Sequence, residues 1–136
     1  MSSTSIQAKM FKAVAADTNS IATSQTTAGA ADLSLTSAAV NDGSNMASTV
    51  TIKSTAGDNS SITFTVSGTD VNGVPGVELN ITGPGTGATV TSSAAFLEVT
   101  NVRANAAVPG NVEVGFTATT TTQGILFAGA TRVRGM

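Results

Sequence analysis

The stretch from Ser61 to Pro84 constrains the fold most, because apolar and polar side chains alternate along it on both sides of a turn-rich segment. A side-chain period of two places alternate residues on one face of a strand. Residues 68–76 between the two alternating runs are rich in Gly, Asp, Asn and Pro, which supply the backbone conformations and local hydrogen bonds of a chain reversal. This stretch therefore predicts two antiparallel strands joined by a turn.

Further alternating segments, at 30–36, 47–55, 96–102 and 111–118, are separated by turn clusters about every ten residues, a spacing typical of β-sandwiches and barrels. Such short connections favour antiparallel pairing, because parallel strands need long crossovers. We therefore expect an all-β fold, an antiparallel β-sandwich of the Ig-like or jelly-roll-like kind. The side chains predicted to fill its core are Leu33, Leu35, Val50, Ile52, Ile62, Phe64, Val66, Val77, Leu79, Ile81, Val99, Val112, Val114 and Phe116.

Two places interrupt the alternation. Residues 92–96 fit a single helical turn, and both Phe96 and Val102 fall out of phase with Leu97 and Val99. The second irregularity predicts either a β-bulge or a strand that starts after Phe96.

The first thirty residues carry two competing patterns. Ile6, Met10 and Val14 have the spacing of a short amphipathic helix, whereas Phe11 and Ala13 belong to an alternating, strand-like run. We favour an extended N-terminal arm or edge segment over residues 1–30. A chain of 136 residues is long enough for one core without disulfides, so we expect residues 31–136 to form a single β-sandwich domain.

Composition excludes several classes of function. The chain has no cysteine and no histidine, so thiolate and imidazole chemistry are excluded. The formal net charge is −2 and only 10% of the residues are charged, which gives no basic surface for nucleic acid. No segment approaches the length of an apolar membrane span, and the N-terminus lacks the pattern of a signal peptide. We expect neither a nucleic-acid nor a membrane partner, and synthesis in a cytoplasm.

The loop Gly83–Ala88 matches the loose dinucleotide-binding pattern G-x-G-x-x-A. That motif needs a helix N-terminus after it to hold a pyrophosphate. Here the following residues read as a strand, and Pro84 removes one backbone donor. A plain hairpin loop is the better interpretation.

Asp70-Val71-Asn72-Gly73 begins like a calcium-binding loop, but the later glycine and glutamate of that motif are out of register. Turn formation explains these residues more simply. An irregular calcium site that combines Asp70 with Asp58 or Asp42 is the alternative. We expect no cofactor.

Glu78, Glu98 and Glu113 are the carboxylates most regularly placed on strands, all at positions predicted to face outward. Outward carboxylates are usually solvated, and acid–base catalysis would need two of them to converge in a cleft. The sequence therefore does not predict an enzyme.

Four residues outside the main alternating segments are candidates for contact with a partner. Arg132 and Arg134 would share one face of a strand and could bind a carboxylate-bearing partner; a solvated C-terminus is the alternative. Phe11 and Phe127 would anchor terminal arms to a neighbour or cap the core. Few charges also leave the sheet edges weakly protected against pairing with another chain, so we expect the edges to be used or covered in an assembly.

Short segments spread from residue 19 to residue 115 resemble small accessory structural proteins of tailed bacteriophages. The segments are Asn19–Gln25, Phe64–Gly73, Ile81–Pro84, Phe96–Val102 and Gly110–Gly115. The resemblance implies a virion protein, made in the host cytoplasm, that decorates or cements the capsid. Its partners would be the major capsid protein and itself, as a dimer or trimer.

Two other functions are kept as alternatives. The first is a tail, fibre or head–tail connector component of a virion. The second is a carbohydrate-binding surface module, which the absence of Trp and Tyr disfavours, because sugar rings commonly stack on aromatic side chains.

Overall fold

The computed structural model describes residues 12–119, which contain eight strands and no helix. The strands are β1 (Asp17–Gln25), β2 (Ala31–Asp32), β3 (Ser48–Ser54), β4 (Thr63–Thr69), β5 (Pro75–Thr82), β6 (Thr89–Phe96), β7 (Glu98–Ala104) and β8 (Val112–Phe116). The predicted all-β class is confirmed.

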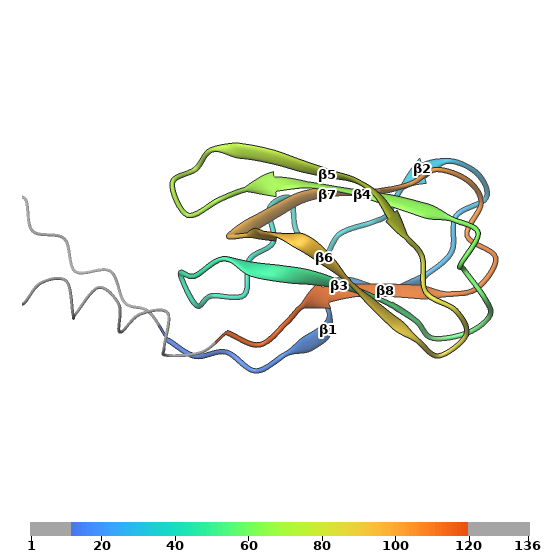
Figure 1. Cartoon of the computed structure of the whole chain (residues 1–136), viewed down its shortest axis with the longest axis horizontal. Helices are drawn as coiled ribbons and strands as arrows, with labels where there is room; N and C mark the ends of the chain where they lie inside the picture. The colour runs from blue at the N-terminus through green and yellow to red at the C-terminus, as the bar shows by residue number, and fades with distance from the viewer. Residues whose placement is uncertain (1–11, 120–136) are drawn as a thin grey trace, which may run out of the picture.

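The strands form two four-stranded sheets packed face to face (Figure 1). One sheet has the order β1-β8-β3-β6 and the other the order β2-β7-β4-β5, and every paired strand is antiparallel to its neighbour. The fold is thus an antiparallel β-sandwich, as predicted. Consecutive strands pair directly only in the β4–β5 hairpin, so the other connections within residues 12–119 cross from one sheet to the other.

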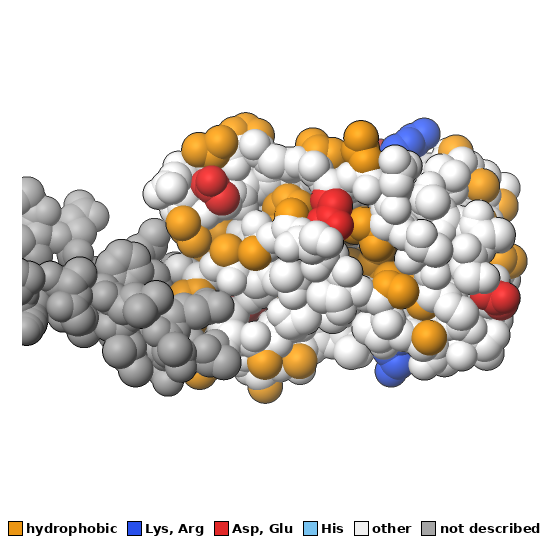
Figure 2. Space-filling model, viewed as in Figure 1, with side chains coloured by type: hydrophobic (Ala, Val, Ile, Leu, Met, Phe, Trp, Pro, Cys, Tyr) orange, Lys and Arg blue, Asp and Glu red, His pale blue; other side chains and the backbone are white. Residues whose placement is uncertain are grey.

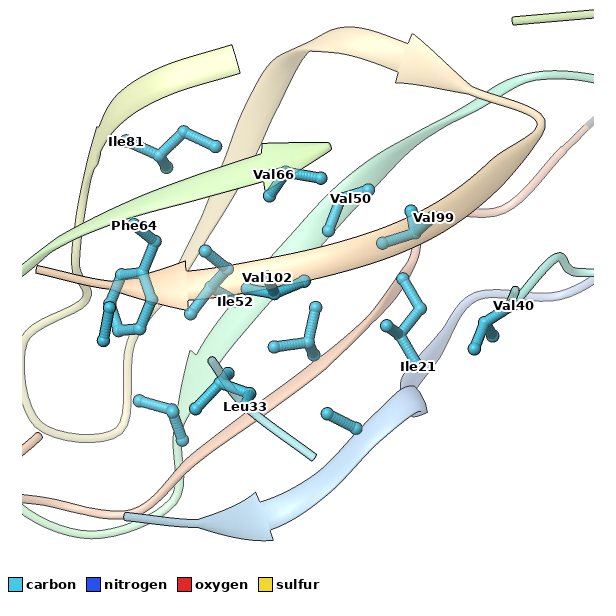
Figure 3. Close-up of a cluster of buried hydrophobic side chains, with 14 of the residues drawn as sticks. Ile21, Leu33, Val40, Val50, Ile52, Phe64, Val66, Ile81, Val99 and Val102 are labelled. Atoms are coloured by element: carbon cyan, nitrogen blue, oxygen red, sulfur yellow. The ribbon is translucent and has the colours of Figure 1, made fainter. Parts of the chain in front are cut away.

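The core lies between the sheets and is mainly aliphatic. Figure 3 shows side chains from both sheets meeting there, among them Phe64, Val66, Ile52 and Val102. Of the fourteen residues predicted to face inward, eleven are buried and Leu35 packs against the core half-buried. Val77 and Leu79 are wrong, because both are exposed.

The predicted helical turn at residues 92–96 is also wrong, because these residues belong to strand β6. The β3–β6 register shifts between the pairs Thr49–Ala95 and Thr51–Thr91. Between these two pairs, the Ser92 hydroxyl accepts a hydrogen bond from the Val50 backbone N–H at 2.8 Å. A bulge closed by a serine side chain therefore produces the irregularity that resembled a helical turn.

The second irregularity is confirmed as both a strand boundary and a bulge. Strand β6 ends at Phe96 and β7 begins at Glu98, while the β4–β7 register shifts between the pairs Ser67–Asn101 and Gly68–Val99. The shift turns both Val99 and Val102 into the core, where each is fully buried.

The N-terminal part of the described chain lies along one sheet. Strand β1 occupies an edge of its sheet, beside β8. Before it, the Val14 carbonyl accepts a hydrogen bond from the Thr119 N–H, and the Val14 N–H donates to the Thr119 hydroxyl, both at 2.9 Å. The two ends of the described chain therefore lie side by side. The division at residue 30 between arm and domain stays a prediction.

Candidate functional site: the exposed edge strand β5

Large hydrophobic side chains with high exposure gather on the β4–β5 hairpin. Within residues 12–119 they are Val71 (46% exposed), Val74 (55%), Val77 (59%) and Leu79 (63%). We call these four residues the apolar hairpin surface. Figure 2 shows hydrophobic side chains along the upper margin of the molecule, over the position of this hairpin in Figure 1. A cluster of exposed apolar side chains on one element commonly marks an interaction site.

A single extra residue in β5 creates this surface. Phe64 is paired with Ile81, but Val66 is paired with Glu78, so β5 holds one residue more than β4 between these pairs. Asn80 has a φ of 59°, in the left-handed region that asparagine tolerates better than most residues. The bulge reverses which side chains face inward, and Val77 and Leu79 consequently point to solvent.

The same reversal turns Glu78 toward the other sheet. One carboxylate oxygen accepts a hydrogen bond from the Ser93 N–H at 2.9 Å, and the other accepts one from the Ala94 N–H at 2.7 Å. Both donors lie in the β6 bulge, where the ladder with β3 is interrupted. Glu78 thus joins edge strand β5 of one sheet to edge strand β6 of the other by hydrogen bonds. The prediction that its side chain faces outward is wrong.

Strand β5 is left as an open edge. It pairs with β4 on one side, and no strand within residues 12–119 pairs with its other side. Its residues, PGVELNIT, include no Lys or Arg, and the carboxylate of its one charged residue is engaged with β6. Natural sheets usually protect such an edge with lysines, proline or a covering segment. Here only Pro75, at the start of the strand, has that role.

Glu113 was also predicted to be a solvated, outward-facing carboxylate, but it is buried. It is only 8% exposed, accepts a hydrogen bond from the Thr18 hydroxyl at 2.6 Å and lies 3.7 Å from the Lys53 ammonium. Glu98 is half-buried at the start of β7. Within residues 12–119, no two of these three carboxylates share a hydrogen-bonding partner.

The loop carboxylates stabilise their own turns. Asp70 Oδ1 accepts hydrogen bonds from the N–H groups of Asn72 and Val74. Hydrogen bonds from Ser60, first from its backbone, lower the pKa of Asp58. No group of three or more Asp, Glu, His or Cys able to hold a metal ion occurs in residues 12–119. The turn interpretation of these residues therefore accounts for their contacts.

The Gly83–Ala88 loop connects the sheets rather than two strands of a hairpin, since β5 and β6 belong to different sheets. Gly83 N–H donates to the Ile62 carbonyl at 2.8 Å, and Ala88 N–H donates to the Gly85 carbonyl at 2.9 Å. Strand β6 follows the loop, so the helix N-terminus required by the dinucleotide motif is not formed here.

The predicted contact residues Phe11, Phe127, Arg132 and Arg134 lie outside the described residues. The apolar hairpin surface was not predicted, because an unbroken alternation would have buried half of it. The available signal was Asn80, a poor strand residue that often adopts positive φ. Among the described residues there is also no helix of the length and hydrophobicity that crossing a bilayer requires.

Comparisons with protein-family models, with curated proteins and with solved structures find no match to this chain.

Proposed function

We propose that this chain is a virion structural protein that decorates or cements a capsid shell through non-covalent contacts with the major capsid protein and with itself. The observation that supports the proposal is the open β5 edge with its apolar hairpin surface. The choice of a capsid as the assembly rests on the resemblance to accessory proteins of tailed bacteriophages.

An open edge suits this function for a physical reason. Strand addition provides main-chain hydrogen bonds for affinity, and side chains on the strand faces provide specificity. Val77 and Leu79 lie two residues apart on the outer face of β5 and are more than half exposed, so an added strand would cover both. Many such contacts at symmetry-related sites would hold a shell together by avidity, although each contact is weak.

The number of copies per particle tests the position in the virion. Quantitative mass spectrometry of purified particles should find copies on the order of hundreds, as repeated symmetric contacts on a shell require. About a dozen copies or fewer would contradict the capsid role and support the tail or connector alternative, since a tail has few equivalent positions.

A binding experiment tests the edge itself. Purified chain should cosediment with particles that lack it, and the double variant V77K/L79K should lose that binding because lysines protect an edge from pairing. T89K/T91K is the matched control, since it places two lysines at the same spacing on exposed positions of β6, an edge strand of the other sheet. Undiminished binding of V77K/L79K would contradict a role for β5.

A further inference from the structure

We infer that the β5 edge receives a C-terminal segment, residues 125–134, donated by a second copy of this chain and added as an antiparallel strand. The inference rests on the proposed self-association and names the surfaces that meet. It follows from the distribution of charge, from the direction in which the chain leaves the sandwich, and from the pattern of the terminal sequence.

Charge separates the body of the molecule from its ends. All eight acidic residues lie within residues 12–119, together with three of the six basic residues. The remaining cations are Lys9, Arg132 and Arg134. The last seventeen residues therefore carry two arginines and no acidic side chain, whereas the body is acidic. Opposite charges favour contact between a C-terminal segment and a body over contact between two bodies.

Acidic groups are also present where the segment would bind. Glu98 is paired opposite Thr69, which in turn is paired opposite Pro75 at the start of β5. Residues directly opposite in antiparallel strands share a face of the sheet, so the Glu98 side chain lies on the same outer face as Val77 and Leu79. Asp70 follows in the hairpin turn. Glu98 therefore adds negative charge beside the apolar hairpin surface, while the arginines, which fall on the other face of the segment from Ile125 and Phe127, are attracted by the acidic body as a whole.

The direction of the strands favours a neighbour's segment over the chain's own. In Figure 1, β8 runs toward the end of the sandwich that holds the β4–β5 turn, which is the end where β5 begins. A segment that turned back from Thr119 onto its own β5 would run parallel to it. A segment from a facing copy can run antiparallel, and antiparallel pairing is slightly more stable per residue.

The terminal sequence has the length and the side chains for this pairing. Seventeen residues follow Thr119, and an extended chain of that length reaches about 55 Å. Residues 120–124 can serve as a spacer. Ile125 and Phe127 fall on one face of a strand and both arginines on the other, so the apolar pair can cover Val77 and Leu79.

Cysteine cross-linking of the full chain tests the inference cleanly, because the chain has no native cysteine. One preparation carries L79C and a second carries F127C, and the two are mixed and treated with a short bismaleimide. We expect a covalent dimer that contains one chain of each kind. F11C replaces F127C in the matched control, which presents a phenylalanine position from the other end of the chain and should give little of this product.

Each other outcome overturns the inference. A dimer of two L79C chains would show that β5 pairs with β5. A cross-linked monomer from the double variant L79C/F127C, without the mixed dimer, would show that the segment binds its own body. If F11C gave more cross-linked product than F127C, the β5 edge would bind the N-terminal segment instead. If no product formed at all, β5 would pair with neither segment.

Charge reversal gives a second measurement that does not need cross-linking. Sedimentation equilibrium of the full chain should show that R132E/R134E weakens self-association about tenfold, as two lost surface ion pairs imply. Salt should reduce the affinity of the unmodified chain and have less effect on the variant. An unchanged association constant would contradict the charge argument.

These measurements use purified chain, whereas the proposed capsid role is tested on particles. Binding to particles without the mixed cross-link would refute only the donated strand. The mixed cross-link without binding to particles would refute only the capsid role.

Discussion

Strands β1 and β5 are both edge strands, but one is closed and the other is open. On β1, Ile21 and Ala22 are fully buried, the Thr18 hydroxyl binds Glu113, and the Asp17 carbonyl lies directly against Gly115. On β5, only Ile81 is buried, and one backbone edge has no partner strand within residues 12–119.

Both edge strands contain bulges. The β1–β8 register shifts between Asp17 and Ala22 and again before Gln25, and the Thr36 N–H and hydroxyl donate to the Ile21 and Ser20 carbonyls of β1 at 2.8 and 2.9 Å. The β5 bulge at Asn80 has the opposite result, because it turns apolar side chains outward. A bulged edge strand can therefore either be held by hydrogen bonds from a neighbouring segment or present apolar side chains to solvent, depending on which side chains the extra residue redirects.

The largest expected effect comes from filling the contact that closes β1. In G115A the new methyl group would collide with the Asp17 backbone, and we expect a loss of about 3 kcal/mol in the free energy of unfolding, at the upper end for overpacking. Urea denaturation measures it. G76A is the control on the open edge, since its methyl group would only reach van der Waals contact with Phe96; a similar loss in both variants would contradict the comparison.

Loss of the Glu78 hydrogen bonds to β6 should have the next largest effect on the free energy of unfolding. E78A leaves the Ser93 and Ala94 N–H groups without their acceptor, and partial access to water limits the cost to about 1–2 kcal/mol. Amide hydrogen exchange at Ser93 and Ala94 should accelerate as well. E98A serves as the control, because Glu98 is equally half-buried but no side-chain hydrogen bond to it is found within residues 12–119. Equal losses would show that Glu78 does not hold β5 to β6.

The bulge residue should have a smaller effect on stability. N80V places a β-branched side chain at positive φ, which costs about 1 kcal/mol, whereas N80G should be nearly neutral because glycine accepts this conformation. Urea denaturation compares the two variants. If valine and glycine proved equivalent, the left-handed backbone at residue 80 would not be what turns Val77 and Leu79 outward.

The smallest effect belongs to a third edge, β2. The hydrogen bond from Arg103, at 3.0 Å, and a second from Asn101 lower the pKa of Asp32. A lowered pKa stabilises the fold above the unfolded-state pKa, and the stabilisation disappears as the pH falls through the folded-state value. Both side chains are exposed, so D32N should cost about 0.5 kcal/mol or less at pH 7 and nothing at strongly acidic pH. A cost that persisted in strong acid would rule out the ion pair as its source.

Local pattern predicted the strands well because burial between two sheets enforces a period of two. The β4 residues Phe64 and Val66 and the β8 residues Val112 and Val114 all occupy the core as their alternation indicated. The β4–β5 hairpin was also predictable, since its turn residues lie between two adjacent alternating runs.

Pairing between distant segments was not predictable in this way. Alternation does not reveal that β8 inserts between β1 and β3, because any alternating strand presents the same two faces to any neighbour. The exposure of the apolar hairpin surface depends on strand register of this kind. Alternation around Val77 and Leu79 predicted burial, and only the register of β5 against β4 shows that both face solvent.

The sequence by itself therefore determined an antiparallel β-sandwich with an aliphatic core, and it excluded histidine and cysteine chemistry. The tertiary structure alone decided which edges are closed, where Glu78 points and which apolar residues remain exposed. The physical reason is that side-chain periodicity is a local property, whereas the register of a bulged strand is set by the hydrogen bonds and packing of its partners.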